Sequence, residues 1–485
     1  MTERTINVKL KDGHEIKVPY EMRLEDLAKR YGGENEPLIV AARVNNKLRE
    51  LTYHMQEDAE VSFVSITSLD GIRIYQRSLS FVFIRAAMEL YKNTHVRVEH
   101  SLSGGLFCEF DSEEKMTIED IAKIKKRMEE IVKADEPFYK EAVPKAEAKA
   151  IFEKFNMESK IHLLTYREHD TINLYTCGWL QNYFYGYMVP STGYLEVFDL
   201  MPYDDGVILR HPNKSHPFDL PEFEEHPKLA QIFKEAERWG EIVGIDYVAK
   251  LNDLIKHGKH FDVIKIAEAL HEKKVAHIAD MIAESGKRLV LIAGPSSSGK
   301  TTFANRLMIQ LQVNGLKPVT VSTDDYFVNR DKTPLDEDGN YDFESVQAVD
   351  TEQFNIDLER LLAGEEVQLP TFNFQIGERE YTGQSMQISE DQPIIIEGIH
   401  GLNEKLTEAI PKKDKFKIYI SALTQLNIDD HNRIPTTDTR LLRRIVRDNR
   451  YRGHNAQRTI DMWPSVRRGG RKKHLPIPRR CGCYV

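Results

Sequence analysis

Gly294-Pro295-Ser296-Ser297-Ser298-Gly299-Lys300-Thr301 directly follows an apolar, strand-like segment at 288–293. It matches G-x-x-x-x-G-K-[ST] at every fixed position, and a helix-like segment follows it. The two glycines let the backbone curl so that successive N–H groups point at phosphate oxygens. A helix N-terminus adds its positive dipole end there. The stretch therefore predicts an ATP site at residues 294–302, ending at Thr302, in which Lys300 serves the β- and γ-phosphates and Thr301 binds Mg²⁺.

A nucleotide site of this kind needs an acidic partner for the metal at the end of another buried strand. Glu397 ends the apolar segment 392–397 and is predicted as that metal ligand. A third strand-like segment, 318–322, leads into Asp324 and Asp325. Open parallel sheets place ligands at the carboxyl ends of their strands. Asp325 is therefore predicted as the base for a substrate hydroxyl and as a further metal ligand, with Asp324 as the alternative.

Segment 438–448 carries four arginines three and four residues apart, Arg440, Arg443, Arg444 and Arg447. This spacing puts them on one face of a helix. Such a stripe can neutralise charge on a transferring phosphoryl group, which is the work of a lid. The alternative is a solvated helix with internal ion pairs, but acidic residues are few here. We predict a lid in which Arg443 and Arg447 are catalytic and Arg440 contacts the substrate.

Six short segments follow one another along residues 287–469: GPSSSGKT at 294–301, DDYF at 324–327, YDFE at 341–344, PTFNF at 370–374, IIIEG at 394–398 and DTRLLRR at 438–444. In these segments and their order, residues 287–469 resemble the uridine kinase and phosphoribulokinase family. The resemblance implies an α/β kinase domain with a parallel sheet, helices on both faces, ATP and Mg²⁺. It also implies substrate contacts by Glu344, Phe372 and Arg379, while Gly377 stands where the family has a pyrimidine-reading histidine. A nucleoside-like, uridine kinase-like acceptor is the expectation.

Residues 1–66 alternate apolar and polar positions around an Asp12-Gly13 turn, and a helical spacing from Leu24 ends at Gly32-Gly33. This pattern predicts a hairpin, a helix and further strands. The segment resembles the TGS domain, a β-grasp module of threonyl-tRNA synthetases and some GTPases.

Residues 67–224 are predicted as a mixed α+β domain that resembles the editing domain of threonyl- and alanyl-tRNA synthetases. In those enzymes a His-x-x-x-His pair and a later Cys/His segment form the reactive or metal site. Here Arg77 and Phe81 stand at the histidine positions, and segment 173–178 offers only Cys177. One thiol cannot hold zinc, which takes four ligands. We expect a scaffold or binding domain without hydrolytic activity.

Three histidines, His211, His216 and His226, lie in a proline-rich stretch and are predicted as surface loop residues rather than metal ligands. Residues 225–286 have helical spacing and are predicted as a connector to the kinase domain. His271 and His277 within it are predicted to lie on the surface.

The chain has 485 residues, a formal net charge of −9 and four cysteines. These values favour a multidomain cytoplasmic protein without a disulfide framework, secretion signal or membrane helix. They disfavour a dedicated nucleic-acid binder, because such a protein needs a clustered basic surface.

The tail at 470–485 is basic and departs from the family pattern after Gly469. Two explanations stay open: a native tail that binds an acidic partner, or a shifted reading frame. The second implies a truncated kinase domain without its last strand and adenine-side loop, and therefore poor stability and weak activity.

Two functions remain in view. The first is Mg²⁺-ATP-dependent phosphorylation of a hydroxyl on a small metabolite. The second is an RNA- or ribosome-associated P-loop NTPase that docks RNA through its N-terminal half.

Overall fold

The computed structural model describes residues 4–33, 36–92, 94–112, 114–335, 339, 341–343, 345–373, 376–408, 410–422, 426–469 and 483–484. The chain forms two compact units that interleave along the sequence. The first unit comprises residues 1–226, 245–256 and 426–433, and the second comprises 227–244, 257–425 and 434–485. The predicted boundaries at 66, 224, 286 and 469 divide the chain into consecutive domains, whereas in the structure the chain passes from one unit to the other several times.

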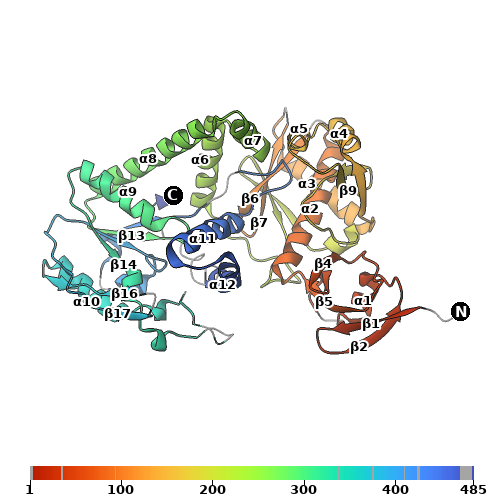
Figure 1. Cartoon of the computed structure of the whole chain (residues 1–485). Coiled ribbons are helices and arrows are strands. Elements are labelled where there is room, and N and C mark those ends of the chain that lie inside the picture. The colour runs from red at the N-terminus through yellow and green to blue at the C-terminus, as the bar shows by residue number, and fades with distance from the viewer. Residues whose placement is uncertain are drawn as a thin grey trace. The chain divides into compact units, whose positions relative to one another are not determined.

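The first unit begins with the predicted hairpin, helix and further strands, and its strands form a five-stranded sheet in the order β2-β1-β5-β3-β4. Apolar residues at every second position of β1 pack against helix α1. The first turn of this helix carries Glu25 and Asp26, and Gly32 is its C-cap. Figure 1 shows this part in red near the N-terminus. Its elements are β1 (Thr5–Leu10), β2 (Glu15–Pro19), α1 (Leu24–Tyr31), β3 (Ile39–Val44), β4 (Lys47–Glu50) and β5 (Ala59–Ser65).

The rest of the first unit surrounds helix α2 (Leu69–Leu90), most of whose residues are buried. Ser68 caps this helix by accepting a hydrogen bond from the N–H of Gly71. Two antiparallel sheets, β11-β12-β7-β6 and β10-β9-β8, share one apolar core with α2 and α3. The elements are β6 (His95–Leu102), β7 (Gly105–Asp111), α3 (Ile118–Lys133), β8 (Tyr139–Pro144), α4 (Lys145–Lys154), α5 (Glu158–Leu164), β9 (Thr171–Cys177), β10 (Leu180–Asn182), β11 (Asp199–Tyr203), β12 (Gly206–Arg210) and α7 (Val248–Lys256).

The second unit is built on a parallel sheet in the order β14-β19-β13-β20-β21. Alternate residues of β13 face opposite sides, so Val290 and Ile292 pack with α8 and α9 while Leu289 and Leu291 pack with α10. The predicted parallel sheet with helices on both faces is confirmed. Its main elements are α6 (Pro227–Val243), α8 (His260–Ser285), β13 (Leu289–Ala293), α9 (Lys300–Val313), β14 (Val319–Ser322), α10 (Thr351–Leu362), β19 (Ile394–Glu397), β20 (Lys415–Tyr419), α11 (Thr436–Arg452), α12 (Ala456–Gly469) and β21 (Cys483–Tyr484). Two short hairpins complete it, β15 (Val367–Gln368) with β18 (Ser385–Met386) and β16 (Thr371–Asn373) with β17 (Glu378–Glu380).

The predicted helical connector is not a separate element. Its last helix, α8, buries Val275, Ile278 and Ile282 in the core of the second unit, and it lies beside α9 in Figure 1. Its middle helix, α7, belongs to the first unit. Helical periodicity identifies these helices but does not say which core each one joins.

Two sequence predictions about surface positions are wrong. His211 is buried, with its ring nitrogens hydrogen-bonded to Gln76 and to the carbonyl of Pro212. His271 is half-buried, with its ring against Phe303. His216 and His277 are exposed as expected.

Cys483 and Tyr484 pair with Ile418 and Tyr419 of β20, so at these two positions the strand edge that a shifted reading frame would expose is covered. Residues 470–482 of the tail lie outside the described residues.

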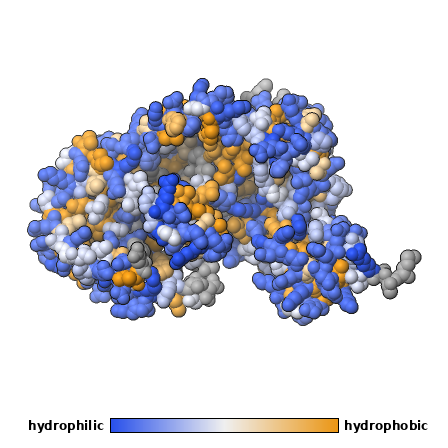
Figure 2. Space-filling model, viewed as in Figure 1, coloured by the Kyte–Doolittle hydropathy of each residue, from blue (hydrophilic) through white to orange (hydrophobic). Residues whose placement is uncertain are grey.

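The visible face of the molecule is mainly hydrophilic, with hydrophobic residues in smaller patches (Figure 2). Within the described residues, no helix has the length and apolar character that a membrane crossing requires.

Candidate functional site

The phosphate-binding loop joins the middle of the parallel sheet to the N-terminus of α9. Ser297 and Gly299 have φ angles of +64° and +104°, the left-handed conformation that turns successive N–H groups to one side. Gly294 has no room for a side chain, because a Cβ there would lie 2.1 Å from the carbonyl oxygen of Ile420. The loop thus has the concave backbone that the sequence pattern predicts.

Thr301, in the first turn of α9, lies next to Glu397, the last residue of β19. The hydroxyl of Thr301 donates to Oε1 of Glu397 at 3.0 Å. Burial raises the pKa of Glu397, the Lys300 ammonium opposes the shift, and the charges of Asp324 and Asp325 raise the pKa further. This cluster of hydroxyl and carboxylate oxygens suits a hard divalent cation, whose charge would relieve the mutual repulsion.

The described residues contain no group of three or more His, Cys, Asp and Glu side chains arranged to hold a metal ion. A Mg²⁺ ion at Thr301 and Glu397 would therefore need phosphate or water oxygens as its remaining ligands. That is the usual way in which Mg²⁺ binds at nucleotide sites.

Asp325 lies in the turn that follows β14. Its Oδ1 accepts a hydrogen bond from the N–H of Phe372 at 3.3 Å. Burial raises the pKa of the Asp325 carboxyl, the Phe372 N–H opposes the shift, and the charge of Asp324 adds to it. Asp325 thus has the partly buried position that suits a base. Asp324 is close enough for its charge to raise the pKa of the Asp325 carboxyl.

Three arginines of α11 reach the phosphate-binding loop. Arg440 donates to the carbonyl of Ser296 through Nε at 3.2 Å and Nη2 at 3.1 Å. Arg443 donates from Nε to the carbonyl of Ser297 at 3.1 Å. Arg444 donates to the hydroxyl of Ser296 at 2.8 Å. The helix therefore lies over the loop, as a lid would.

Arg447 is placed differently from the prediction. Its Nε and Nη2 donate to Oδ1 of the fully buried Asp448 at 3.0 and 2.7 Å. Nε of Arg444 lies 3.2 Å from the other oxygen of Asp448. Arg447 thus braces the lid through Asp448, and Arg444, which the site prediction omitted, contacts the loop. The i, i+4 spacing of Arg444 and Asp448 is a sequence signal for their ion pair, whereas Arg447 and Asp448 are adjacent and no such spacing marks their contact.

The predicted acceptor side is assembled only in part. Phe372 is buried against the ring of Phe327, and Arg379 donates to Asp350 at 2.9 Å. A Cβ at Gly377 would lie 2.6 Å from Nε of Arg330, so the Arg330 side chain fills the space beside position 377. Glu344 lies outside the described residues.

At the positions expected to carry histidines, the synthetase-like domain has a buried phenylalanine and a partly buried arginine. Phe81 contacts Phe184 with ring centroids 5.0 Å apart, and Arg77 donates to the carbonyl of Tyr187 at 2.6 Å. Cys177 instead lies 3.4 Å from Arg85, eight residues further along α2. Segment 184–188 thus contacts Arg77 and Phe81, while the thiol of segment 173–178 contacts Arg85 instead.

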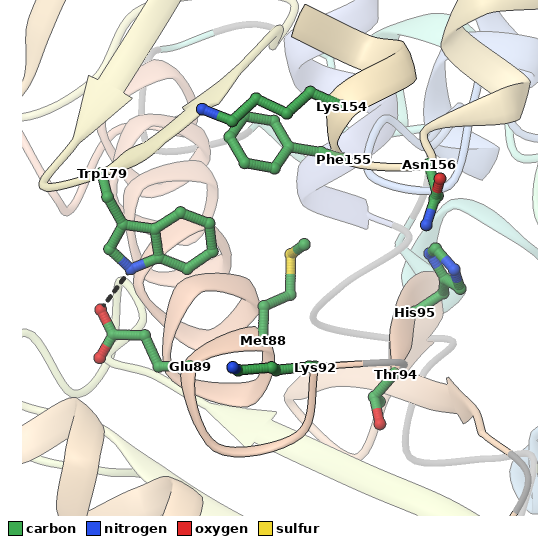
Figure 3. Close-up of a pocket in the computed structure, with 9 residues that line it drawn as sticks. All are labelled: Met88, Glu89, Lys92, Thr94, His95, Lys154, Phe155, Asn156 and Trp179. Atoms are coloured by element: carbon green, nitrogen blue, oxygen red, sulfur yellow. Dashed lines mark hydrogen bonds between the residues drawn. The ribbon is translucent and has the colours of Figure 1, made fainter.

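A cavity of about 400 Å³ lies elsewhere in the first unit, at the C-terminal end of α2. Trp179 borders it and donates to Oε1 of Glu89 at 2.7 Å, while the amino groups of Lys92 and Lys154 lie on opposite sides (Figure 3). None of the predicted site residues lines this cavity.

A parallel sheet, a phosphate loop after its middle strand and an arginine helix above that loop define a P-loop nucleotide-binding fold. Residues 289–469 match the model of the Phosphoribulokinase / Uridine kinase family. The C-terminal region of the chain is thus a domain of that family.

The N-terminal region matches threonine–tRNA ligases. The enzymes of Cupriavidus necator and Rubrobacter xylanophilus are both 29% identical, over 197 and 193 residues, or 40% of this chain. The alignments span 31% and 30% of those enzymes, about a third of their length. Among solved structures, a possible uridine kinase from Bacillus stearothermophilus is 18% identical and covers 43% of this chain and 96% of its own, with a TM-score of 0.28.

Proposed function

We propose that the kinase-family domain transfers the γ-phosphoryl group of ATP to a hydroxyl group on a small metabolite. The observation that carries this proposal is that two features lie at the end of the parallel sheet where β13, β19 and β14 finish. Asp325 stands at the strand end as a partly buried carboxylate, and Arg440, Arg443 and Arg444 are hydrogen-bonded to the phosphate loop. A hydrolase needs a positioned water, whereas a positioned base beside a cationic lid suits transfer to an acceptor.

The contacts at the site support one role for each residue in this proposal. The loop N–H groups and Lys300 bind the β- and γ-phosphates, and Asp325 takes the proton of the attacking hydroxyl. The guanidinium of Arg443 lies beside Gly299, where it can stabilise charge on the transferring group. Thr301 and Glu397 would hold Mg²⁺, which would supply positive charge to offset that of the phosphate oxygens.

The acceptor is proposed to be nucleoside-like, in keeping with the family match. The Arg330 side chain beside Gly377 puts a cation where a neutral base edge would be read. An acceptor that carries a carboxylate or phosphate group therefore belongs in the same test.

The test is ATP turnover against a panel of nucleosides, sugars and anionic polyols, with ADP and phosphorylated product both measured. We expect ADP release that depends on one class of acceptor. ADP release that is equal without an acceptor would contradict the kinase proposal.

A second function rests on the similarity of the N-terminal region to threonine–tRNA ligases. It is an RNA- or ribosome-associated NTPase that uses those domains to dock RNA in the cytoplasm. It predicts that tRNA or ribosomes, rather than small acceptors, stimulate ADP release. The same assay with these additions separates the two proposals.

A further inference from the structure

Residues 426–433 lie between β20 and the lid helix α11 in the sequence, yet they are part of the first unit. We call this segment the anchor. Its centre is an ion pair between Nζ of Lys160 and Oδ1 of Asp429 at 2.6 Å, with 2% and 0% of the side chains exposed. Lys160 belongs to α5 of the synthetase-like domain, whereas Asp429 lies within the stretch that matches the kinase family. A buried lysine of the first domain thus binds a segment of the second sequence region.

The anchor is bound by backbone as well as by side chains. The N–H of Val98 donates to the carbonyl of Asp430 at 2.8 Å, and the N–H of Val248 donates to that of Asn427 at 3.0 Å. The hydroxyls of Ser159 and Tyr247 both bond to the Asp430 carboxylate. Hydrogen bonds of this number and burial fix the path of the anchor within the first unit.

Asp429 also shapes the anchor itself. Its Oδ1 accepts from the N–H groups of His431 and Asn432 at 3.0 and 3.1 Å. The amide of Asn432 in turn accepts from the N–H of Tyr185 at 3.0 Å. Lys160 neutralises the carboxylate around which this turn is built, so its loss would leave a buried charge without compensation.

The lid helix begins almost where the anchor ends. Only Ile434 and Pro435 separate Arg433 from Thr436, the first residue of α11. Three residue steps span at most about 11 Å, and proline fixes one of their torsions. The start of the helix that carries Arg440 and Arg443 is thus tied to the anchor by a short, stiff link.

We propose that Lys160 is a positioning residue for phosphoryl transfer, acting through Asp429 and the anchor on the arginines of α11. This inference rests on the proposed kinase function. It gives the synthetase-like domain a role in catalysis that requires neither RNA binding nor hydrolysis. A displacement of about 1 Å at a reacting centre can cost about 10²-fold in rate, so a loosened anchor has a measurable effect.

The first test is Lys160→Met, which keeps the side-chain length and removes the charge. We expect kcat to fall about 10- to 100-fold, while KM for the acceptor changes less than about twofold, because the lid arginines serve the transferring group. Lys140→Met is the matched control, since Lys140 pairs with Glu50 at a more exposed site in the same unit. It should leave kcat within about twofold.

The second test is the double variant Lys160→Met with Asp429→Asn. The asparagine keeps an oxygen that accepts from His431 and Asn432 but carries no charge that needs a lysine. We expect it to recover most of the lost kcat. If Lys160→Met does not fold, Ser159→Ala with Tyr247→Phe loosens the anchor by two hydrogen bonds and should lower kcat in the same direction. An unchanged kcat in these variants would overturn the proposal.

Hydrogen exchange of the full chain gives a readout independent of the acceptor. In Lys160→Met, amides in the first turns of α11 should exchange faster, while those of β6 and β7 stay protected. Faster exchange throughout the first unit would show a merely structural role and contradict the proposal. If no acceptor supports turnover, the kinase proposal fails, but the exchange of α11 with a non-hydrolysable ATP analogue still tests the anchor.

Discussion

Lys300 is the residue on which nucleotide chemistry depends most directly, because it is the cation that begins α9 under the phosphate loop. Lys300→Ala should reduce turnover by at least about 10²–10³-fold, since developing charge on the phosphates would go uncompensated. ADP release measured at saturating ATP tests this. Turnover close to the unmodified protein would refute the assignment of the loop.

Asp325 is expected to act in the chemical step rather than in nucleotide binding. Asp325→Asn should bind ATP normally and slow phosphoryl transfer by about 10²–10⁴-fold, the usual contribution of a positioned base. Equilibrium ATP binding and single-turnover kinetics separate the two effects. If Asp324→Asn has this effect and Asp325→Asn does not, the base is the neighbouring residue.

His211 makes the stability of the first unit depend on pH. Burial lowers the pKa of His211 to about 4, while an unfolded histidine has a pKa near 6.5. The unfolded chain therefore takes up a proton first as pH falls, and stability is lost between about pH 6.5 and 4, by up to about 1.4 kcal/mol per pH unit.

Thermal unfolding between pH 7 and pH 5 measures this dependence. His211→Gln should reduce the slope, because glutamine does not titrate. His277→Gln, at an exposed position, should leave the slope unchanged. Equal slopes for the two variants would contradict the role of burial.

Helix α11 carries arginines that contact the phosphate loop and arginines that do not. Arg443 touches the phosphate loop, whereas Arg450 is exposed in the last turn. Arg443→Ala should lower kcat by about 10- to 1000-fold because a positioned cation is lost from the transferring group. Arg450→Ala should change kcat by less than about twofold. Similar losses in both variants would indicate a general effect of helix charge.

The helical period at 438–448 predicted this helix and its cationic stripe. It did not predict which arginines reach the loop, because residues three and four apart share a face equally well. The position of the buried Asp448 decides that Arg444 bridges the loop and the helix while Arg447 braces the helix. Which partner a side chain contacts depends on tertiary packing, and the helical period of the sequence does not predict that packing.

The synthetase-like domain should not hydrolyse mischarged tRNA. Phe81 packs on Phe184, and Arg77 is bound to a backbone carbonyl, so these positions offer neither a base nor a metal ligand. Incubation of the full chain with mischarged threonine tRNA should release no amino acid above the rate in buffer. Deacylation that is lost in the Arg77→Ala variant would contradict this.

Local patterns in the sequence were enough for the phosphate loop at 294–301, the strand that ends at Glu397 and the β-grasp hairpin, because each depends on neighbours only a few residues away. The interleaving of the two units was not foreseeable in this way. Lys160 and Asp429 are far apart in the chain, and only burial in a common core brings such groups together. Periodicity records which face of an element is apolar, but the three-dimensional packing chooses the surface which that face meets.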